Sequence, residues 1–257
     1  MLSTIKMKPT VITLPVSKNR VQRVRHEIKR RALTVARVES ISPHVRRIVF
    51  TGDDLADFNS ASFDDHIKFI LDTDAAEPVR RDYTPRSFDA VARELTLEFA
   101  LHGDGPAASW AQQAQPGQQA VVAGPKGSLI IPLDYDWHLL VGDDTAMPAI
   151  ARRLEELPSG ARVTVILQVP DAADRRTFDS AASVTLQWVD SANAMLGAVR
   201  AWNLPAGDGY AWCAGEAAAM AALRKILIDE KGHDRHGIRA AAYWKQGAVA
   251  HHENIED

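Results

Sequence analysis

The sequence is poor in cysteine and contains no long apolar run. Cys213 is the only cysteine among 257 residues, which excludes an internal disulfide and any zinc or iron–sulfur site built from several thiolates. No stretch of about 18 apolar residues occurs, so we expect no segment that inserts into a membrane. Residues 1–20 also lack the continuous apolar segment of a secretory signal. These absences predict a protein of the reducing cytoplasm.

An excess of charge of one sign is missing as well. The formal net charge is −3, so the chain as a whole has no attraction for nucleic acid or for an anionic membrane. The exception is local, because residues 1–31 carry nine Lys and Arg against the single Glu27. A nucleic-acid arm is one interpretation of this segment. We favour a basic, flexible N-terminal extension that leads into the first strand, since basic and acidic residues are well mixed elsewhere.

Short runs that alternate apolar and polar residues follow this extension. They are typical of half-buried strands and are separated by turn residues. Six such runs predict a small antiparallel β-barrel, which we place in a domain over residues 32–134. The runs cover residues 32–40, 44–52, 66–72, 94–102, 119–127 and 128–133.

A different pattern begins near residues 131–137. Buried-type strands now alternate with segments whose apolar residues recur at helical spacing, which predicts an α/β domain with a mostly parallel sheet over residues 135–257. The predicted strands cover residues 138–143, 162–169, 184–190, 210–215 and 238–244. The predicted helices cover residues 146–157, 191–202 and 216–231.

The run RRDYTPRSFD at residues 80–89 combines arginines with an aromatic ring and a hydroxyl. Pro85 biases Thr84 toward an extended conformation, so Arg81 and Tyr83 should share one face of a strand end. A ring can stack on a planar ligand, a hydroxyl can bond to its edge, and a guanidinium suits a pyrophosphate. A solvated charged edge and a basic patch remain the alternatives for this run.

A glycine turn in HGDGPAASWA, residues 102–111, precedes a predicted helix. Gly103 and Gly105 permit a tight turn, and Pro106 suits the first helical position. The free N–H groups at such a helix start favour a phosphate, although an ordinary loop-to-helix junction explains the turn equally well. Together with residues 80–89, the turn favours a cofactor that carries both a ring and phosphates.

These segments resemble the siderophore-interacting proteins, which are FAD-dependent ferric-siderophore reductases of the ferredoxin-reductase-like superfamily. The resemblance rests on the order and spacing of several segments, and YWKQG near the end distinguishes the family from its relatives. The segments cover residues 64–70, 81–89, 102–111, 124–128, 142–158, 214–227 and 243–247.

The resemblance implies an FAD-binding β-barrel followed by an NAD(P)H-binding-like α/β domain. It implies that Tyr83 lies against the isoalloxazine, Thr84 near its redox-active edge, and Arg81 toward the diphosphate. It also implies that the following turn and helix start complete the diphosphate and ribose contacts. These residues are His102, Gly103, Asp104, Gly105, Ala107, Ala108 and Ser109, although His102 could instead brace the loop.

The first turn of the α/β domain is acidic. Relatives that bind NAD(P)H tightly have a glycine-rich turn at this point, and two carboxylates there repel a diphosphate. The resemblance implies that Asp143, Asp144 and Thr145 lie near the adenine side of the FAD. Capping of the following helix by Asp143 or Asp144 explains the same residues equally well.

The resemblance also points to three lysines as the substrate site. Lys68, Lys126 and Lys245 would converge on the flavin cleft and attract an anionic ferric siderophore, whereas the alternative for each is an ordinary surface lysine. We expect no catalytic side chain and no protein ligand for iron, because the siderophore keeps its own ligands.

The predicted function is reduction of ferric siderophores in the cytoplasm, with release of Fe(II). Electrons would come from NADPH, NADH or a reduced ferredoxin and pass through FAD to Fe(III). A general NAD(P)H-dependent flavin reductase is an alternative. A non-catalytic siderophore-binding protein, or a nucleic-acid module that uses the basic extension, is another.

Overall fold

The computed structural model describes residues 20–71, 76–101, 105–248 and 253–255. His102, Gly103 and Asp104, which we predicted as cofactor contacts, therefore lie outside the described residues. Within the described part of the chain, no helix is long and apolar enough to cross a membrane.

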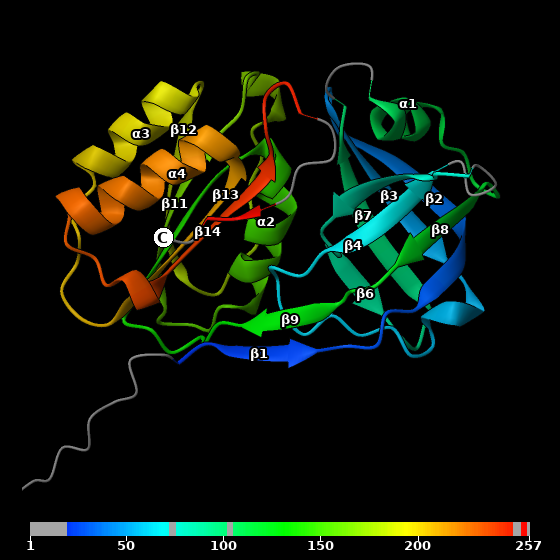
Figure 1. Ribbon diagram of the computed structural model, residues 1–257, viewed down its shortest axis with the longest axis horizontal. Helices are drawn as coiled ribbons and strands as arrows, with labels where there is room; N and C mark the ends of the chain where they lie inside the picture. The colour runs from blue at the N-terminus through cyan, green and yellow to red at the C-terminus, as the bar shows by residue number, and fades with distance from the viewer. Residues whose placement is uncertain (1–19, 72–75, 102–104, 249–252, 256–257) are drawn as a thin grey trace, which may run out of the picture.

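The first half of the chain forms an antiparallel sheet with the strand order β5-β4-β8-β2-β3-β7-β6 (Figure 1). Alternate side chains such as Phe50, Phe69, Leu97 and Phe99 point into one core, and Trp110 of the helix α1 (Pro106–Gln113) packs against it. The strands are β2 (Arg30–Ser42), β3 (Val45–Thr51), β4 (Ile67–Leu71), β5 (Val79–Tyr83), β6 (Ser87–Asp89), β7 (Glu94–Ala100) and β8 (Gln119–Ala123).

Two local predictions need correction here. The strand predicted over residues 119–127 ends at Ala123, because Gly124 has a φ of 104° and Pro125 lacks an N–H for the ladder. Residues 22–25 are not part of a flexible tail. They form β1 (Gln22–Arg25), which pairs antiparallel with β9 (Gly127–Ile130) as a separate ribbon.

The second half forms a six-stranded sheet in the order β12-β11-β10-β13-β14-β15. The first five are parallel, and the short β15 (Glu253–Asn254) runs antiparallel to β14. The parallel strands are β10 (Trp137–Asp143), β11 (Arg162–Gln168), β12 (Ser183–Val189), β13 (Gly209–Glu216) and β14 (Ile238–Trp244). The predicted order, an antiparallel sheet followed by a parallel α/β unit, is confirmed.

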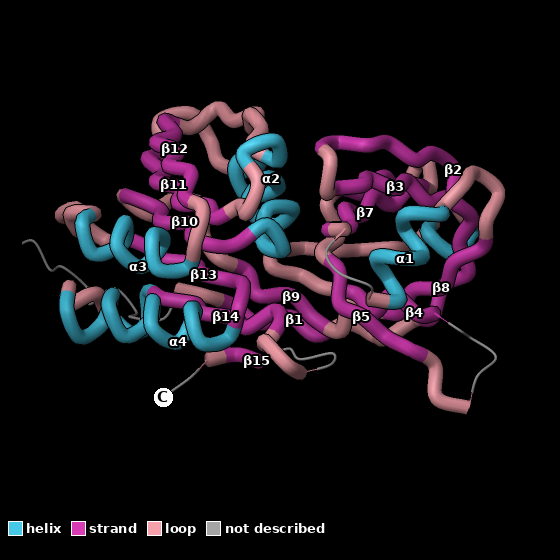
Figure 2. The backbone as a smooth tube through the Cα atoms, turned by 90° about the horizontal axis from the view of Figure 1, so that it is seen from above, coloured by secondary structure: helices cyan, strands magenta, loops and turns pink. Residues whose placement is uncertain are grey.

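Helices cover both faces of the parallel sheet (Figures 1 and 2). Leu140 and Trp212 face α2 (Met147–Glu156), whereas their neighbours Leu139 and Cys213 belong to the opposite core. That core packs against α3 (Ala192–Ala201) and α4 (Ala217–Lys225). The helix predicted over residues 216–231 continues beyond α4 as a π-helical turn, Ile226–Glu230. Burial on both faces explains why these strands are almost continuously apolar.

Candidate functional site

A pocket of about 720 Å³ lies between the two sheets. The antiparallel half contributes β4, β5, β7 and the start of α1, and the α/β half contributes the carboxyl ends of β10, β11 and β14. Open α/β sheets bind ligands at the carboxyl ends of their strands. Ten residues predicted from the sequence line this pocket: Lys68, Arg81, Tyr83, Thr84, Gly105, Ala107, Ala108, Asp143, Asp144 and Thr145.

The wall formed by β5 carries a half-buried aromatic ring, that of Tyr83. The ring centroid of Tyr83 lies 4.3 Å from that of Phe99 and 5.9 Å from that of Phe69. Burial raises the pKa of the Tyr83 hydroxyl well above its usual range, so the phenol stays neutral. Tyr83 thus offers a fixed flat surface and a hydroxyl that can donate or accept a hydrogen bond.

Thr84 joins the two halves of the molecule at the pocket. It is buried at the end of the β5 segment, and its side chain shares a hydrogen bond with the hydroxyl of Tyr243 on β14. Burial raises the pKa of Tyr243 well above its usual range, so this bond is between neutral groups. The pocket wall is therefore continuous from one sheet to the other.

The start of α1 offers donors for an anion. Gly105 is the N-cap residue, Pro106 occupies the first turn, and no side chain among the described residues caps the helix. The N–H groups of Ala107 and Ala108 belong to the first turn of this helix, where backbone N–H groups favour a phosphate, and both residues line the pocket. Arg81 lines the same pocket, with Nη1 at 2.8 Å from the carbonyl oxygen of Arg80. A helix start, a guanidinium and a half-buried ring fit the diphosphate and the isoalloxazine of FAD.

The carboxylate of Asp143 connects three segments of the α/β half through hydrogen bonds. It accepts hydrogen bonds from the amide of Thr145 at 3.0 Å, the Thr145 hydroxyl, the amide of Glu216 at 2.9 Å and the indole of Trp244 at 2.8 Å. Asp143 thus caps the short helix Asp144–Ala146 by accepting from the amide of Thr145, as the capping alternative predicted. Burial, with help from the nearby Asp144, raises the pKa of Asp143 to about 6. A carboxylate has about four acceptor positions, and these four donors use them.

Gly142 and Gly215 leave the space that these contacts of Asp143 need. A Cβ on Gly215 would lie 2.5 Å from Oδ2 of Asp143, and the φ of 151° also requires glycine there. A Cβ on Gly142 would lie 2.6 Å from the carbonyl oxygen of Ala214. These glycines let the ends of β10 and β13 approach each other closely. In a glycine-rich dinucleotide-binding turn, glycine instead lets the backbone approach a phosphate.

Four other lining residues bear on the chemistry of the pocket, and none of them was predicted as a site residue. Tyr243 and Trp244 come from the segment YWKQG, where the aromatic residues were a usable signal, and Trp244 is 41 % exposed. Glu98 and Arg176 form an ion pair of 2.6 Å across the two halves. Burial alone would raise the pKa of Glu98, but Arg176 and Arg47 outweigh it and lower that pKa. Only the fold shows that Glu98 is buried at a pocket.

The three predicted lysines have different positions. Lys68 lines the pocket and pairs with Asp82. Lys245 is exposed and directly follows Trp244, while Lys126 is exposed between β8 and β9; neither is among the lining residues, and Ser109 is not either. The convergence of the three ammonium groups stays a prediction.

Among the described residues, no group of three His, Cys, Asp or Glu side chains could hold a metal ion.

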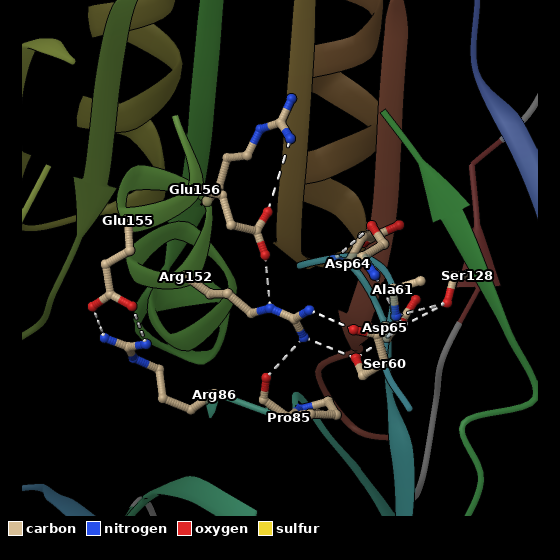
Figure 3. Close-up of polar contacts among 12 residues, drawn as sticks. Ser60, Ala61, Asp64, Asp65, Pro85, Arg86, Ser128, Arg152, Glu155 and Glu156 are labelled. Atoms are coloured by element: carbon tan, nitrogen blue, oxygen red, sulfur yellow. Dashed lines mark hydrogen bonds and ion pairs between the residues drawn. The ribbon is translucent and has the colours of Figure 1, made fainter. Parts of the chain in front are cut away.

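A buried arginine connects α2 to the segment that follows β5 (Figure 3). Arg152 of α2 donates through Nη1 to the Ser60 hydroxyl at 2.8 Å and to the carbonyl oxygen of Pro85 at 3.1 Å. Its Nη2 donates to the carbonyl oxygen of Ser60 at 2.7 Å. Asp65 accepts in turn from the hydroxyls of Ser60 and Ser128. Because Pro85 follows Thr84 directly, the position of the β5 end depends on α2.

Two family models match the chain. The model of the siderophore-interacting FAD-binding domain matches residues 34–79 and 72–129. The model of the siderophore-interacting protein matches residues 135–247. Together they cover both halves of the molecule that line the pocket.

Curated relatives match over most of their length. The chain is 36 % identical over 245 residues to an NADPH-dependent ferric-chelate reductase of Escherichia coli, covering 87 % of this chain and 96 % of that protein. It is 33 % identical over 252 residues to the ferric vibriobactin reductase ViuB of Vibrio cholerae, covering 87 % and 93 %.

Solved structures agree with the fold. A siderophore utilization protein from T. fusca superposes with a TM-score of 0.83 at 32 % identity, covering 90 % of this chain and 98 % of that one. The siderophore-interacting protein SipS of Aeromonas hydrophila gives 0.76 at 32 %, covering 88 % and 93 %. A ferredoxin reductase of a carbazole 1,9a-dioxygenase system gives 0.67 at 18 %, covering 84 % and 70 %, and shares the fold.

Proposed function

The chain belongs to the siderophore-interacting protein family, and we propose that it is an FAD-dependent ferric-siderophore reductase. The observation that carries this proposal is that Arg81, Tyr83 and the start of α1 line one and the same pocket. The relatives named as a ferric-chelate reductase and a ferric vibriobactin reductase support the same activity.

The pocket residues divide the work of holding FAD. Arg81 and the amides of Ala107 and Ala108 would bind the diphosphate, with Gly105 and Ser109 shaping that turn. Tyr83 would lie along the isoalloxazine, and Thr84 near its edge. Asp144 and Thr145 would face the adenine side, while Asp143 acts through its bonds to the protein. His102, Gly103 and Asp104 complete the proposed set.

When bound, FAD would accept electrons from the donor and deliver them singly to Fe(III) in the siderophore. The side chains around it position both partners. The hydroxyl of Tyr83, which stays neutral, and the buried Thr84 add no charge to the pocket at these two positions. Lys68, Lys126 and Lys245 are the proposed contacts for an anionic ferric siderophore.

The donor is proposed to be NADPH, with NADH or a reduced ferredoxin as alternatives. The name of the Escherichia coli relative supports NADPH. Asp144 in the first turn of the α/β half favours weak, transient dinucleotide binding, because its charge repels a diphosphate. We further propose a cytoplasmic protein with an FAD-binding domain over residues 32–134 and an NAD(P)H-binding-like domain over residues 135–257.

The test is spectroscopic and kinetic. Purified protein should show the visible absorption of oxidised flavin, and mixing with NADPH, NADH or reduced ferredoxin under anaerobic conditions should bleach it at different rates. Addition of a ferric siderophore should restore the absorption and release Fe(II) to a colorimetric chelator. A colourless protein that FAD cannot reconstitute would overturn the proposal. Turnover of free flavin without preference for ferric chelates would favour a general flavin reductase.

A further inference from the structure

Lys68 and Asp82 form an ion pair at the pocket. They are directly opposite each other in the antiparallel pairing of β4 and β5, and Nζ lies 2.7 Å from Oδ1. Both residues line the pocket. The side chain of Asp82 is 16 % exposed and that of Lys68 is 47 % exposed, so the carboxylate is the more fixed partner.

This pair is on the opposite face of the β4–β5 ribbon from the proposed cofactor wall. Side chains alternate along a strand, and cross-strand partners share a face. Tyr83 contacts Phe69 in the core, so Lys68 and Asp82, one residue away on each strand, point to the other face. A change at Asp82 therefore alters charge at the pocket without touching the ring of Tyr83.

The ion pair of Lys68 and Asp82 weakens the electrostatic attraction that Lys68 exerts on an approaching anion. An isolated ammonium attracts an anion as a full charge, whereas an ammonium beside a carboxylate presents a dipole whose field falls off faster. If Lys68 turned toward a ligand, the negative charge of Asp82 would remain behind it. Arg80, two residues from Asp82 on the same face, is exposed and keeps some attraction.

We propose that Asp82 is a specificity-determining residue that offsets Lys68 and biases the protein toward ferric siderophores of low negative charge. This inference rests on the proposed function, because it concerns which ferric siderophore the same pocket reduces. A ferric tris(hydroxamate), which is uncharged, would lose little from the carboxylate. A ferric tris(catecholate), which is triply anionic, would meet a weaker attraction than three unpaired lysines would supply.

The test compares Asp82→Asn with the unchanged protein on these two chelates. Asparagine keeps the shape of the side chain and removes its charge. At low ionic strength we expect kcat/KM for the ferric tris(catecholate) to rise about fivefold, through KM, as for other rim charges. The value for the ferric tris(hydroxamate) should change less than twofold, and about 0.5 M salt should remove the gain.

Two further variants make the result specific. Glu94→Gln removes the same unit of charge from another ion pair of this sheet, between Glu94 on β7 and Arg37 on β2 at 2.7 Å, and Glu94 does not line the pocket. This variant should leave the ratio of the kcat/KM values for the two chelates unchanged. Lys68→Met should lower kcat/KM for the anionic chelate, and adding Asp82→Asn to it should restore part of that loss.

The outcomes separate this inference from the proposed function. If the unchanged protein binds FAD but reduces neither chelate, the proposed function fails. If the unchanged protein reduces both chelates but Asp82→Asn leaves the ratio of their kcat/KM values unchanged, only the role of Asp82 fails. The same holds if Glu94→Gln shifts this ratio as much as Asp82→Asn does. Loss of FAD from Asp82→Asn would also overturn that role, because Asp82 would then act in cofactor binding.

Discussion

The indole Nε1 of Trp244 donates a hydrogen bond of 2.8 Å to the buried carboxylate of Asp143, which ties the end of β14 to the turn after β10. The two residues are 101 positions apart in the chain. Because the same carboxylate also accepts from the amide of Glu216, it connects the carboxyl ends of β10, β13 and β14. The ends of β10 and β14 line the pocket.

The first prediction concerns the protonation of Asp143. Its pKa is raised from 3.8 to about 6 in the folded protein, so its proton stabilises the fold below pH about 4, and that stabilisation is lost as the pH rises through about 6. Burial also raises the pKa of Asp65, so global stability alone does not isolate Asp143. We expect the indole N–H resonance of Trp244 to titrate with a midpoint near 6. Asp143→Asn should remove the titration, and a midpoint near 4 would contradict the burial argument.

A second prediction concerns the space beside Asp143. Gly215→Ala should lower the free energy of unfolding by about 2–4 kcal/mol, because the new Cβ meets the carboxylate and the φ of 151° disfavours alanine. Gly197→Ala is the matched control, since it lies inside α3 with nothing within 4 Å of the new Cβ, and it should stabilise by about 0.5–1 kcal/mol. Urea unfolding measures both, and equal effects would contradict the prediction.

The buried Arg152, which connects α2 to the segment after β5, gives a third prediction. Arg152→Met removes the donors to Ser60 and Pro85, and should destabilise the protein by about 2–4 kcal/mol because buried acceptors lose their partners. FAD affinity should fall about tenfold as the end of β5 loses its support. Arg200→Met removes only an exposed pair with Glu230 and should cost less than about 0.5 kcal/mol. Fluorescence titration with FAD and urea unfolding give the two readings, and unchanged FAD affinity in Arg152→Met would show that β5 holds its position unaided.

The ring of Tyr83 is the subject of the fourth prediction. Tyr83→Ala should weaken FAD binding by at least about tenfold, because the flat wall against Phe99 is lost. Tyr83→Phe keeps the ring and should keep most of the affinity. FAD content after gel filtration, read from the visible absorption, distinguishes them. Equal FAD loss in both variants would assign the role to the hydroxyl.

The last prediction separates cofactor from substrate. Lys245→Ala should leave FAD content unchanged, because this exposed lysine is outside the pocket lining. Turnover of an anionic ferric siderophore should fall about three- to tenfold, through KM, because one attracting charge is lost. Steady-state kinetics with the anionic and uncharged chelates measure the effect. Loss of FAD in this variant would contradict the proposed division of roles.

Much of the fold was predictable because burial leaves a periodic pattern. The alternation around Phe50 and Phe99 predicted antiparallel strands, and the almost unbroken apolar run that ends at Asp143 predicted a strand buried on both faces. Motif order predicted the family, and the residues around Tyr83 were brought to one pocket with the start of α1. These signals are local or depend on order along the chain, so sequence alone carries them.

The two kinds of sheet, their order and the residue types available for FAD follow from the amino-acid sequence alone. The three-dimensional packing is what settles which charges are paired. Asp143 meets Glu216 and Trp244, Glu98 meets Arg176, and Lys68 meets Asp82. It also decided that residues 22–25 pair with β9. The reason is physical: periodicity reports how deeply a side chain is buried, whereas the partner of a buried charge depends on which distant segments the packing brings within hydrogen-bond distance.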